Sequence, residues 1–262
     1  MPAPLITLTT DFGLSDYYVG AMKGVILSIC PRARIVDVSH GVGAFEIAEA
    51  AFTLSQAYRY FPRGAVHVVV VDPGVGTSRR PILAQAAGQH FIAPDNGVLS
   101  MIYAREKHKV RAISNASYFL QPVSNTFHGR DIFAPVAAHL AGGIPPARFG
   151  KLVADYLRLD FDKPARSGRR TWTGAILKVD RFGNLVTNFS AEDFPDLDKR
   201  AFEMAVGAQR IDAFARNYAE HGPGEAFLIL GSANYYEISM YQSSAAKLLG
   251  CAAGAPLELT LL

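Results

Sequence analysis

In the N-terminal part of the chain, short apolar runs alternate with segments whose apolar residues recur every three or four positions. The short runs at 5–10, 34–39, 65–71, 82–86, 91–92 and 110–113 predict strands, and the periodic segments at 16–30, 45–60, 98–105 and 130–141 predict helices. The run 65–71 is nearly unbroken and rich in Val, which is typical of a central parallel strand covered on both faces. The alternation predicts an α/β fold with a mostly parallel sheet built from βαβ units.

The first predicted helix has recognisable boundaries. Ser15 or Asp16 is suited to cap its N-terminus, and Pro31 follows its last residue. Cys30 lies in its apolar run, where a buried thiol is the expected state. The chain has two cysteines, too few for a disulfide framework, and its first residues lack a signal-peptide pattern, so we expect a cytoplasmic protein.

The pattern changes after about residue 160. The stretch 160–170 is polar, contains Pro and Gly and shows no apolar period, which predicts a linker. Beyond it, short β-type runs predict a small all-β domain, and they lie at 174–179, 185–188, 226–230, 235–240 and 256–261. We therefore expect an N-terminal α/β domain at residues 1–162, a linker at about 163–170, and a C-terminal all-β domain at 171–262.

Composition narrows the functional classes. The 262 residues are 50% hydrophobic and 19% charged, which suits a globular protein with a substantial core and excludes a disordered chain. The net charge is only +3 and the basic residues are scattered, whereas a nucleic-acid-binding surface needs a basic stripe. No window approaches about 18 uninterrupted apolar residues, so we expect no membrane-spanning helix. These observations favour a small-molecule ligand over a nucleic-acid or membrane partner.

Several common cofactor signatures are missing. The Gly-x-Gly pairs at 41–43 and 74–76 extend neither to the dinucleotide fingerprint nor to a phosphate-binding P-loop. There is no Gly-x-Ser-x-Gly nucleophile elbow, and the seven histidines show no zinc-binding spacing. We therefore expect neither a metal nor a cofactor, and we interpret His67 and His108 as ordinary strand or surface residues.

Two carboxylates follow predicted strands, at the edge where parallel sheets bind ligands. Asp11 follows the first strand in the motif Thr-Thr-Asp-Phe-Gly, although an Asp in this position also caps its own turn. Asp72 follows the run 65–71 and opens the loop Asp-Pro-Gly-Val-Gly-Thr-Ser-Arg-Arg, in which Arg79 is able to fold back onto it. An Arg partner would keep Asp72 ionised and oriented for chemistry, and the alternative is an ion pair that only braces the turn.

Three further segments carry candidate groups. His128 lies between Phe127 and a Gly in the loop before the last N-terminal helix, where a surface role is the alternative to a catalytic one. Asp180 and Asn184 flank Arg-Phe-Gly in the all-β region, a sequence that is also typical of a hairpin turn. The segment 230–239 joins turn residues to a strand and is uninformative by itself.

Taken together and in this order, the five motifs resemble one family, the S-adenosyl-L-methionine hydroxide adenosyltransferases, which are related to the fluorinases and chlorinases. The resemblance extends over essentially the whole chain, from the Thr-Thr-Asp-Phe-Gly motif to the strand at 235–240. It implies a larger N-terminal α/β domain joined to a small C-terminal β-barrel, and a homotrimer whose ligand lies between the N-terminal domain of one subunit and the C-terminal domain of its neighbour. It also implies hydrolysis of S-adenosyl-L-methionine to adenosine and L-methionine, without a cofactor.

The resemblance also assigns roles to residues of this chain. The family's water-activating Asp, Arg and His correspond to Asp72, Arg79 and His128, with Arg80 as an adjacent alternative for the Arg. The substrate-binding positions that it implies are Asp11 for the ribose, Asp16 for the methionine amino group, Asn184 for the adenine, and Phe45, Phe127, Asp180, Tyr218, Ser232, Glu237 and the backbone of Gln242 around the pocket.

This chain departs from its halogenating relatives in ways that bear on the reaction. They carry an Arg beside the Ser of the turn at Ser232, where this chain has Ala233, so recognition of the methionine carboxylate stays open. They also carry a Tyr at the position of Asp72 and lack His128. A carboxylate repels a halide by roughly 4 kcal/mol at 4 Å and an effective dielectric of 20, so water attack is favoured over 5′-halogenation. The other alternative is a sensor of adenosine or S-adenosyl-L-methionine without turnover, which would need no such Asp, Arg and His set.

Overall fold

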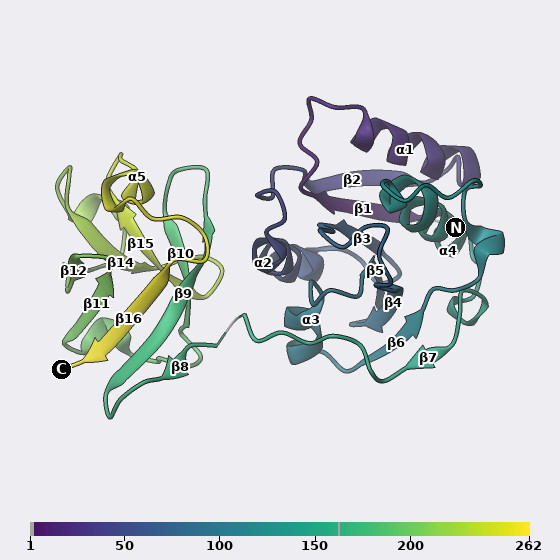
Figure 1. Cartoon of the computed structure of the whole chain (residues 1–262). Coiled ribbons are helices and arrows are strands. Elements are labelled where there is room, and N and C mark those ends of the chain that lie inside the picture. The colour runs from purple at the N-terminus through teal and green to yellow at the C-terminus, as the bar shows by residue number, and fades with distance from the viewer. Residues whose placement is uncertain (1–2, 162) are drawn as a thin grey trace. The chain divides into compact units, whose positions relative to one another are not determined.

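The computed structural model describes residues 3–161 and 163–262, and the chain divides into two compact units, Met1–Leu159 and Asp160–Leu262 (Figure 1). Unit 1 contains helices and a mixed sheet, and unit 2 is built around a second, curled sheet. The expected domain limits, 1–162 and 171–262, include positions 1, 2 and 162, which lie outside the described residues.

The sheet of unit 1 has seven strands in the order β2-β1-β3-β5-β4-β6-β7. The sequence pattern predicts six of them to within a few residues and gives no sign of the two-residue β7. In β3, the Val-rich strand, all five residues are buried, and the strand pairs in parallel with β1 and β5, which confirms the prediction of a central parallel strand. The strands are β1 (Leu5–Thr10), β2 (Arg34–Ser39), β3 (Val66–Val70), β4 (Pro81–Ala86), β5 (Gln89–Pro94), β6 (His108–Ala112) and β7 (Leu152–Val153).

Only the first part of this sheet is parallel. Strands β2, β1, β3 and β5 run parallel, whereas β4, β6 and β7 join through antiparallel pairings, so the expectation of a mostly parallel sheet is too broad. The reason lies in the two-residue connection between β4 and β5, where Ala87 and Gly88 have positive φ angles of 52° and 74°. Two positive φ angles are typical of a tight hairpin turn, whose flanking strands are antiparallel.

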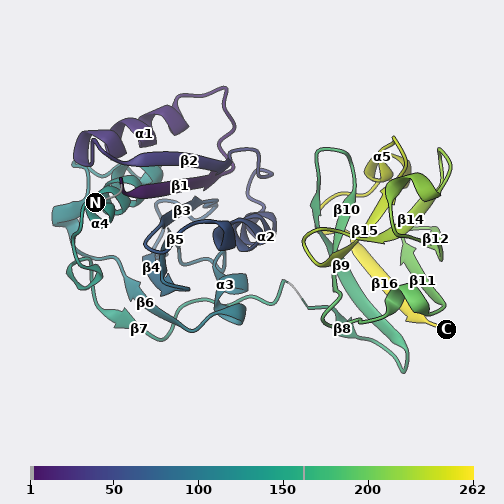
Figure 2. The same cartoon turned by 180° about the vertical axis from the view of Figure 1, so that it is seen from behind.

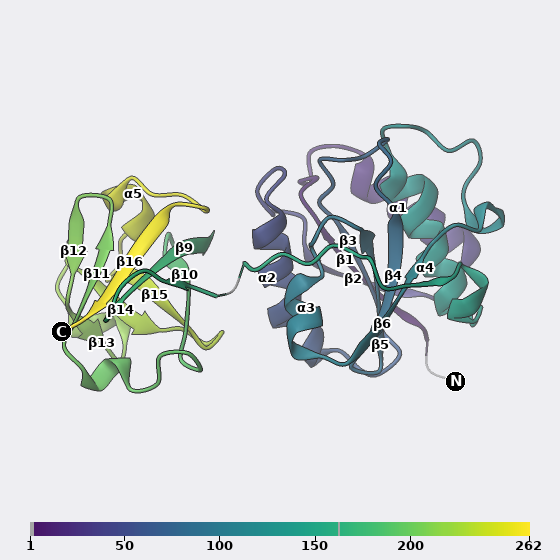
Figure 3. The same cartoon turned by 60° about the horizontal axis from the view of Figure 1, so that its bottom comes forward.

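Four α-helices among the described residues of unit 1 cover its sheet in two pairs. Helices α1 and α4 lie on one side of the strands and α2 and α3 on the other, as Figure 3 shows. The side chains of β3 alternate between the two sides, with Val68 in the core under α1 and α4 and Val69 in the core under α2 and α3. Unit 1 is therefore a three-layer α/β unit. The helices are α1 (Tyr18–Ile29), α2 (Ile47–Ala57), α3 (Ser100–Arg105) and α4 (Ala134–Ala141), with shorter helical turns at Tyr58–Tyr60, Ala116–Tyr118, Pro146–Arg148 and, as a π-helical turn, η3 (Gly129–Phe133).

The four α-helices described in unit 1 begin two to four residues later than predicted, and for α1 and α2 the backbone shows why. Helix α1 begins at Tyr18 and its N-cap is Tyr17, so the expectation that Ser15 or Asp16 caps it is wrong, because both residues precede the first helical turn. Helix α2 begins at Ile47 rather than at Phe45, because Phe45 has a φ of 69°, which no α-helix accommodates.

The sheet of unit 2 has nine strands and curls on itself, as the view from behind shows (Figure 2). Its path runs β12-β11-β16-β9-β10-β15-β14-β13, and β8 pairs with β9 outside this path. The strands are β8 (Ala165–Arg166), β9 (Thr171–Val179), β10 (Leu185–Ser190), β11 (Phe202–Val206), β12 (Gln209–Ile211), β13 (Phe214–Ala215), β14 (Ala226–Leu230), β15 (Tyr235–Met240) and β16 (Pro256–Leu261).

Unit 2 differs from the sequence prediction in three features. The segment expected to be a linker contains β8, where Arg166 pairs with Trp172 and its guanidinium lies 5.8 Å from the centre of the indole ring. The strands β11 to β13 were not predicted; β12 and β13 have only three and two residues, and β12 exposes two of its three, whereas β11 has five. The unit is also not all-β, since it contains α5 (Ala245–Leu249) and 3-10 turns at Leu197–Lys199 and Tyr218–Glu220.

The helices of both units are short. The two longest α-helices described, α1 and α2, have 12 and 11 residues, whereas crossing a bilayer takes about 20 apolar residues. None of the helices in the described ranges has the length and apolar character that a membrane crossing requires.

Candidate functional site

A hollow of about 390 Å³ opens in unit 1 beside the ends of β1 and β3. Its lining comes from the loops that follow β1, β2 and β3 and from the segment before η3, and it combines polar groups with aromatic rings. The fold thus gathers side chains that lie far apart in the sequence. The sequence-predicted residues that line it are Asp11, Phe45, Asp72, Phe127 and His128.

Asp72 and Arg79 form the ion pair that the loop sequence predicts. Arg79 Nε donates to Asp72 Oδ1 at 2.9 Å, and Arg79 Nη2 donates to Asp72 Oδ2. The Asp72 and Arg79 side chains are only 5% and 9% exposed, and the Arg79 guanidinium lies 5.3 Å from the centre of the Phe133 ring. A two-pronged contact with a buried Arg fixes the plane of the carboxylate, so the remaining lone pairs of Asp72 keep a fixed direction.

The same guanidinium contacts His128. Arg79 Nη2 donates to His128 Nδ1 at 2.8 Å, so Nδ1 carries no hydrogen and the neutral ring holds its proton on Nε2. Burial and the positive charge of Arg79 lower the pKa of His128 below its ordinary 6.5, and the negative charges of Asp72 and Asp131 only partly oppose this. His128 is therefore neutral at neutral pH, and Asp72, Arg79 and His128 form one connected cluster.

Two features of the backbone bring the loops of this cluster together. Gly76 has a φ of 77°, and a side chain there would collide with the carbonyl oxygen of Asn125. The loop after β3 therefore packs directly against the segment that precedes η3. Asp131, which is fully buried in η3, holds that segment in turn by accepting a hydrogen bond from Ser124 N at 2.8 Å.

Arg80, the neighbour of Arg79, has other partners. Its guanidinium donates to Asp95 Oδ2 at 2.8 Å and to Asp155 Oδ1 at 2.9 Å. These contacts brace the segment after β7 against the loop after β5, and none of the three residues lines the hollow. Arg79 is thus the Arg that meets Asp72, and Arg80 belongs to a separate ion-pair network.

Asp11 lines the hollow from the loop after β1. Its Oδ2 accepts a hydrogen bond from Phe45 N at 2.9 Å, which ties this loop to the loop after β2. Phe45 is 69% exposed despite its size, which is a large apolar surface to leave in water. Asp16 is exposed and does not line this hollow, so unit 1 does not bring it together with the other candidate residues.

A larger hollow of about 1120 Å³ lies in unit 2. Its walls are the hairpin between β9 and β10, the turn between β14 and β15, the 3-10 turn after β13 and the segment after β15. These segments are separate in the sequence, and the curled sheet brings them together. The hollow gathers every sequence-predicted residue of this unit, namely Asp180, Asn184, Tyr218, Ser232, Glu237 and Gln242.

The Asp180 carboxylate builds the hairpin that presents Asn184. Asp180 Oδ1 accepts hydrogen bonds from the backbone N–H groups of Phe182 and Asn184, both at 2.9 Å, and Oδ2 accepts one from Asn184 Nδ2 at 2.8 Å. Because Nδ2 is held in this way, the carboxamide of Asn184 has a fixed orientation. Its Oδ1 has no hydrogen-bond partner in the part of the chain that the structure describes, so it can accept one from a ligand.

Glu237 titrates close to neutral pH. Burial, and to a smaller degree the negative charge of Asp180, raise the pKa of Glu237 to about 7. Burial, followed by the charges of Glu237 and Asp180, also raises the pKa of Tyr218. Gly231 passes so close to the Glu237 carboxyl group that a side chain at that position would collide with it. A carboxyl group with a pKa near 7 is able to donate or accept a hydrogen bond at neutral pH.

The two hollows also contain residues that sequence reasoning did not single out. Tyr18 lines the hollow of unit 1, where its ring meets the Phe127 ring edge to face with centres 5.0 Å apart. Arg216 and Tyr241 line the hollow of unit 2. Tyr18 is visible in the sequence only as part of an apolar helical stripe, and Arg216 belongs to no motif, so neither residue carries a signal of its role.

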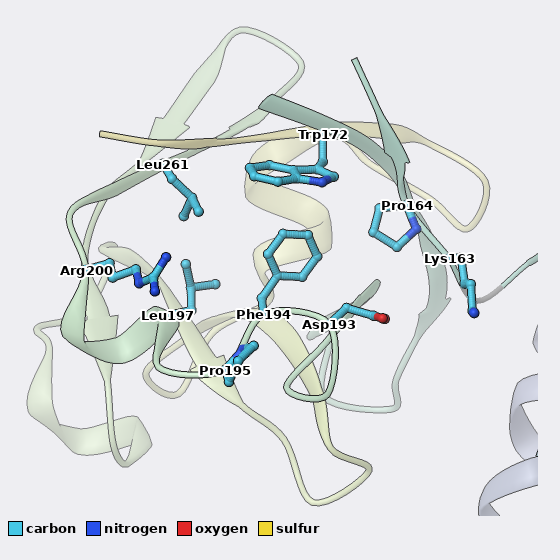
Figure 4. A pocket seen from close by; sticks show the side chains of 9 residues that line it. All are labelled: Lys163, Pro164, Trp172, Asp193, Phe194, Pro195, Leu197, Arg200 and Leu261. Atoms are coloured by element: carbon cyan, nitrogen blue, oxygen red, sulfur yellow. The ribbon is translucent and has the colours of Figure 1, made fainter. Parts of the chain in front are cut away.

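Other features of the chain lie apart from these two hollows. A third hollow, of about 360 Å³, occupies another part of unit 2 and contains none of the candidate residues. Figure 4 shows its Trp172 and Phe194 rings, which meet edge to face at 5.1 Å, with Lys163 and Arg200 at its margins. Across residues 3–161 and 163–262, no three or more His, Cys, Asp or Glu side chains are grouped so as to hold a metal ion.

Comparisons with known proteins identify the family. Family models described as the N-terminal and C-terminal domains of SAM (S-adenosyl-L-methionine) hydroxide adenosyltransferase match residues 6–150 and 174–258. A Salinispora tropica protein named (R)-S-adenosyl-L-methionine hydrolase is 37% identical, over 99% of this chain and 98% of the relative, and an Actinoplanes protein named fluorinase is 31% identical, over 74% and 75%. The crystal structure of an uncharacterized conserved protein from Thermotoga maritima superposes with a TM-score of 0.86 at 36% identity, over 97% of this chain and 99% of the other. This chain therefore belongs to the SAM hydroxide adenosyltransferase family.

Proposed function

We propose that this chain hydrolyses S-adenosyl-L-methionine by attack of water at C5′, giving adenosine and L-methionine. The observation that carries the proposal is the connected, partly buried cluster of Asp72, Arg79 and His128 beside the hollow of unit 1. Binding a nucleoside does not require such a cluster, whereas orienting a water and removing its proton does. Relatives named (R)-S-adenosyl-L-methionine hydrolase, at 32–37% identity over nearly the whole chain, support the same reaction.

The leaving group of this reaction needs little help from the protein. The sulfonium departs as a neutral thioether, so no acid is required to protonate it. The task is to hold a water in line with the C5′–S bond and to accept its hydrogen bond, and a fixed geometry of this kind supplies several kcal/mol of the barrier. Asp72 suits the task because it lines the hollow and Arg79 fixes its carboxylate plane. A positioned base adds about 10²–10⁴-fold to the rate.

His128 has the second role in the proposed mechanism. Its Nδ1 already accepts a hydrogen bond from Arg79, so a proton reaches Nδ1 only after that contact opens. Asp72 is therefore the first acceptor of the water's hydrogen bond, and its contacts with Arg79 fix the direction in which it accepts. As the C5′–O bond forms, the water becomes more acidic, and its proton passes to Asp72 or, once Arg79 has moved, to His128.

The remaining candidate residues bind the substrate in this proposal. Asp11 accepts hydrogen bonds from the ribose hydroxyls, with one of its oxygens already fixed by Phe45 N. Asn184 reads the adenine through its free Oδ1, which is suited to an exocyclic amine. Asp16 contacts the methionine amino group. The other members of the proposed pocket are Phe45, Phe127, Asp180, Tyr218, Ser232, Glu237 and the backbone of Gln242.

The proposal also covers the oligomeric state, the cofactor requirement and the cellular location of the protein. In this proposal, the curled sheet of unit 2 forms a barrel, and the chain assembles as a homotrimer whose sites are shared between copies. The family resemblance supports both statements. The division of the candidate residues between two units supports the shared sites. No cofactor takes part, because a sulfonium and a positioned water suffice for the chemistry. A cytoplasmic location is supported by Cys30 and Cys251, which are both free thiols.

The charge of the cluster argues against 5′-halogenation as the activity. Asp72 lines the hollow in which the nucleophile has to lie. At 4 Å and an effective dielectric of 20, its carboxylate repels a halide by roughly 4 kcal/mol, whereas it attracts a water. The relative named fluorinase is also matched over a smaller share of the chain, 74%, than the relative named hydrolase, 99%.

The test of the proposed reaction uses isotope labelling. The purified protein is incubated with S-adenosyl-L-methionine in ¹⁸O-water, with and without chloride, and the products are followed by mass spectrometry. Adenosine labelled at its 5′ oxygen, together with free methionine, is the expected result. A 5′-halogenated product would instead establish halide transfer, and substrate that binds but stays intact would establish a sensor.

The substitution Asp72→Asn tests the cluster itself. The amide keeps the shape of the side chain and removes its charge, so kcat should fall by about 10²–10⁴-fold while adenosine affinity, measured by calorimetry, changes little. Asp95→Asn is the matched control, because Asp95 is equally buried and paired with an Arg but lies outside the hollow. Similar losses of kcat in both variants would mean that Asp72 acts only through stability.

A further inference from the structure

His40 is a buried histidine at the junction of two loops that border the hollow of unit 1. It follows the last residue of β2 and is 5% exposed. The register between β1 and β2 shifts by one residue between Leu8 and Thr9, so β2 contains one residue more than its partner over this stretch. The shift brings His40 level with Thr10, the last residue of β1.

A chain of polar contacts runs through His40 to Thr10. Lys23 Nζ donates to Asp37 Oδ2 at 2.6 Å, and Asp37 Oδ1 lies 3.1 Å from His40 Nε2. On the other side of the ring, His40 Nδ1 lies 2.8 Å from the Thr10 hydroxyl. When the neutral ring holds its proton on Nε2, Nδ1 is an acceptor and the Thr10 hydroxyl is the donor.

These contacts continue into the loop that carries Asp11. The Thr10 hydroxyl oxygen accepts a hydrogen bond from Phe12 N at 3.2 Å. The carbonyl oxygen of His40 accepts a second one, from Gly13 N at 2.8 Å. The backbone is therefore held on both sides of Asp11, by the Thr10 hydroxyl that the His40 ring contacts and by the main-chain carbonyl of His40.

We infer that His40 is a positioning residue for Asp11: through the Thr10 hydroxyl and the Gly13 N–H group, it holds the Asp11 carboxylate in the orientation that receives the ribose of the substrate. The inference rests on the proposed function, in which Asp11 accepts hydrogen bonds from the ribose hydroxyls. His40 itself does not line the hollow, so it acts through Asp11 and not by touching the ligand.

Thr7 of β1 forms a second Thr–His pair, with His67 of β3, which does not contact the loop that carries Asp11. Thr7 Oγ1 lies 2.8 Å from His67 Nδ1, and both residues are fully buried. His67 Nε2 lies 3.3 Å from Gln89 Oε1, and burial lowers the pKa of His67 to about 4. This pair matches the pair at the end of β1 in chemistry, distance and burial. Removing the Thr7 hydroxyl therefore measures the loss of a buried hydrogen bond without an effect on the loop that carries Asp11.

The experiment compares Thr10→Val with Thr7→Val in the full chain. Both changes remove one buried hydroxyl and keep the shape of the side chain, so both should lower the melting temperature to a similar extent. Only Thr10→Val should raise KM for S-adenosyl-L-methionine and Kd for adenosine, by about tenfold, with kcat within about threefold of wild type. Thr10→Ser, which restores the hydroxyl, should restore the wild-type KM and Kd.

A second variant, His40→Phe, tests the histidine directly. It keeps an aromatic ring and removes the Nδ1 acceptor, so it should raise KM and the adenosine Kd as Thr10→Val does, and the double variant should lose no more than either single one. Unchanged KM and Kd in both single variants, with normal wild-type turnover, would overturn the positioning role alone. Wild-type protein that neither binds adenosine nor consumes S-adenosyl-L-methionine would overturn the proposed function and this inference with it.

Discussion

One guanidinium holds the candidate catalytic groups of unit 1. Arg79 donates to both oxygens of Asp72 and to Nδ1 of His128, so its position determines the orientation of both. Residues that act as such a unit give strongly non-additive effects when they are changed singly and together. The role of each is therefore better separated by its pH dependence than by the size of the loss it causes.

The pH dependence of kcat/KM should report His128. Burial and the Arg79 charge hold the folded-state pKa of His128 below 6.5, so the ring is neutral above that pH and becomes charged as the pH falls through its folded value. A depressed pKa of this kind contributes stability above pH 6.5 that is lost on acidification, and the charged ring can no longer accept from Arg79. Steady-state kinetics should thus show activity falling on the acid side below pH 6.5.

A control histidine separates this effect from a general loss of activity at acidic pH. His139 also has a pKa lowered by burial, but it lies on α4 and lines neither hollow. His128→Asn should remove the acid-side fall below pH 6.5, whereas His139→Asn should keep it. Glu237 titrates at about 7, so Glu237→Gln should alter the profile near that pH and leave the lower fall in place. An acid-side fall that persists in His128→Asn would exclude this histidine as its origin.

At the residue scale, the sequence was sufficient to predict contacts between residues that lie in the same loop. Asp72 and Arg79 are seven positions apart, and the turn residues between them predict that the chain folds back. The family resemblance favoured Arg79 over Arg80, but the partners of Arg80 were not predictable, because Asp95 and Asp155 come from distant segments. The network around His40 was not predictable for a similar reason, since a strand register creates it.

The hairpin between β9 and β10 is the element that organises the candidate residues of unit 2. Asp180 N donates to Asn184 O at 3.0 Å, and the Asp180 carboxylate holds the tip of the turn. Gly183 has a φ of 87°, and a side chain there would collide with Ser244 on the segment after β15. The hairpin is thus locked both internally and against a neighbouring segment, which fixes Asn184 before any ligand arrives.

Asp180→Ala should loosen this element and weaken adenosine binding. The change leaves two backbone N–H groups and the Asn184 carboxamide without their acceptor, so the free energy of unfolding should fall by about 1–3 kcal/mol. Adenosine affinity should fall by about tenfold, because Asn184 loses its fixed orientation. Thermal denaturation and calorimetry measure the two effects.

Asp193→Ala is the control for this prediction. Asp193 is a solvent-exposed Asp of unit 2 whose carboxylate also accepts a hydrogen bond in a turn, from Ser190 Oγ at 2.7 Å. It lies outside the hollow that contains Asn184. It should lower stability without changing adenosine affinity. An affinity that falls equally in both variants would show that unit 2 responds to any loss of stability, and the hairpin would have no separate role.

At the element scale, sequence patterns predicted every described strand of five or more residues except β11, and missed the strands of two or three residues. β3 was predicted from its Val residues, whereas the two-residue β7 and β8 form only because a neighbouring strand offers a free edge. The antiparallel half of the unit 1 sheet follows from Ala87 and Gly88, whose positive φ angles the strand periodicity does not reveal. Helix boundaries set by a positive φ angle, such as the start of α2 after Phe45, were not predicted either, because side-chain periodicity does not reveal backbone angles.

At the scale of the whole molecule, the candidate residues are divided between two compact units. Unit 1 holds the Asp72 cluster and Asp11, and unit 2 holds Asn184 and Glu237. The proposed reaction needs both sets around one substrate. The proposed homotrimer supplies them from two copies, and a mixing experiment distinguishes that arrangement from a site made within one chain.

Mixing Asp72→Asn with Asn184→Ala should restore activity if sites are shared between copies. The first variant has an intact unit 2 and the second an intact unit 1, so each alone should be nearly inactive at substrate concentrations below KM. In a homotrimer with head-to-tail sites, subunits mixed one to one combine two intact units at about one quarter of the sites, the product of two independent halves. The mixture should therefore recover about one quarter of the wild-type activity after subunit exchange, which native mass spectrometry of tagged copies verifies.

A site within one chain predicts a different outcome. Every copy in the mixture then carries one defect in its own site, so no combination of subunits recovers activity, whatever the oligomer. A mixture of Asp72→Asn with His128→Asn, both altered in unit 1, should recover nothing in either arrangement, and this shows whether recovery requires complementary units. Recovery in the first mixture alone would mean that the substrate is held between two copies. Exchange without recovery would mean that both units of one chain enclose it, and the homotrimer, if present, would then serve another purpose.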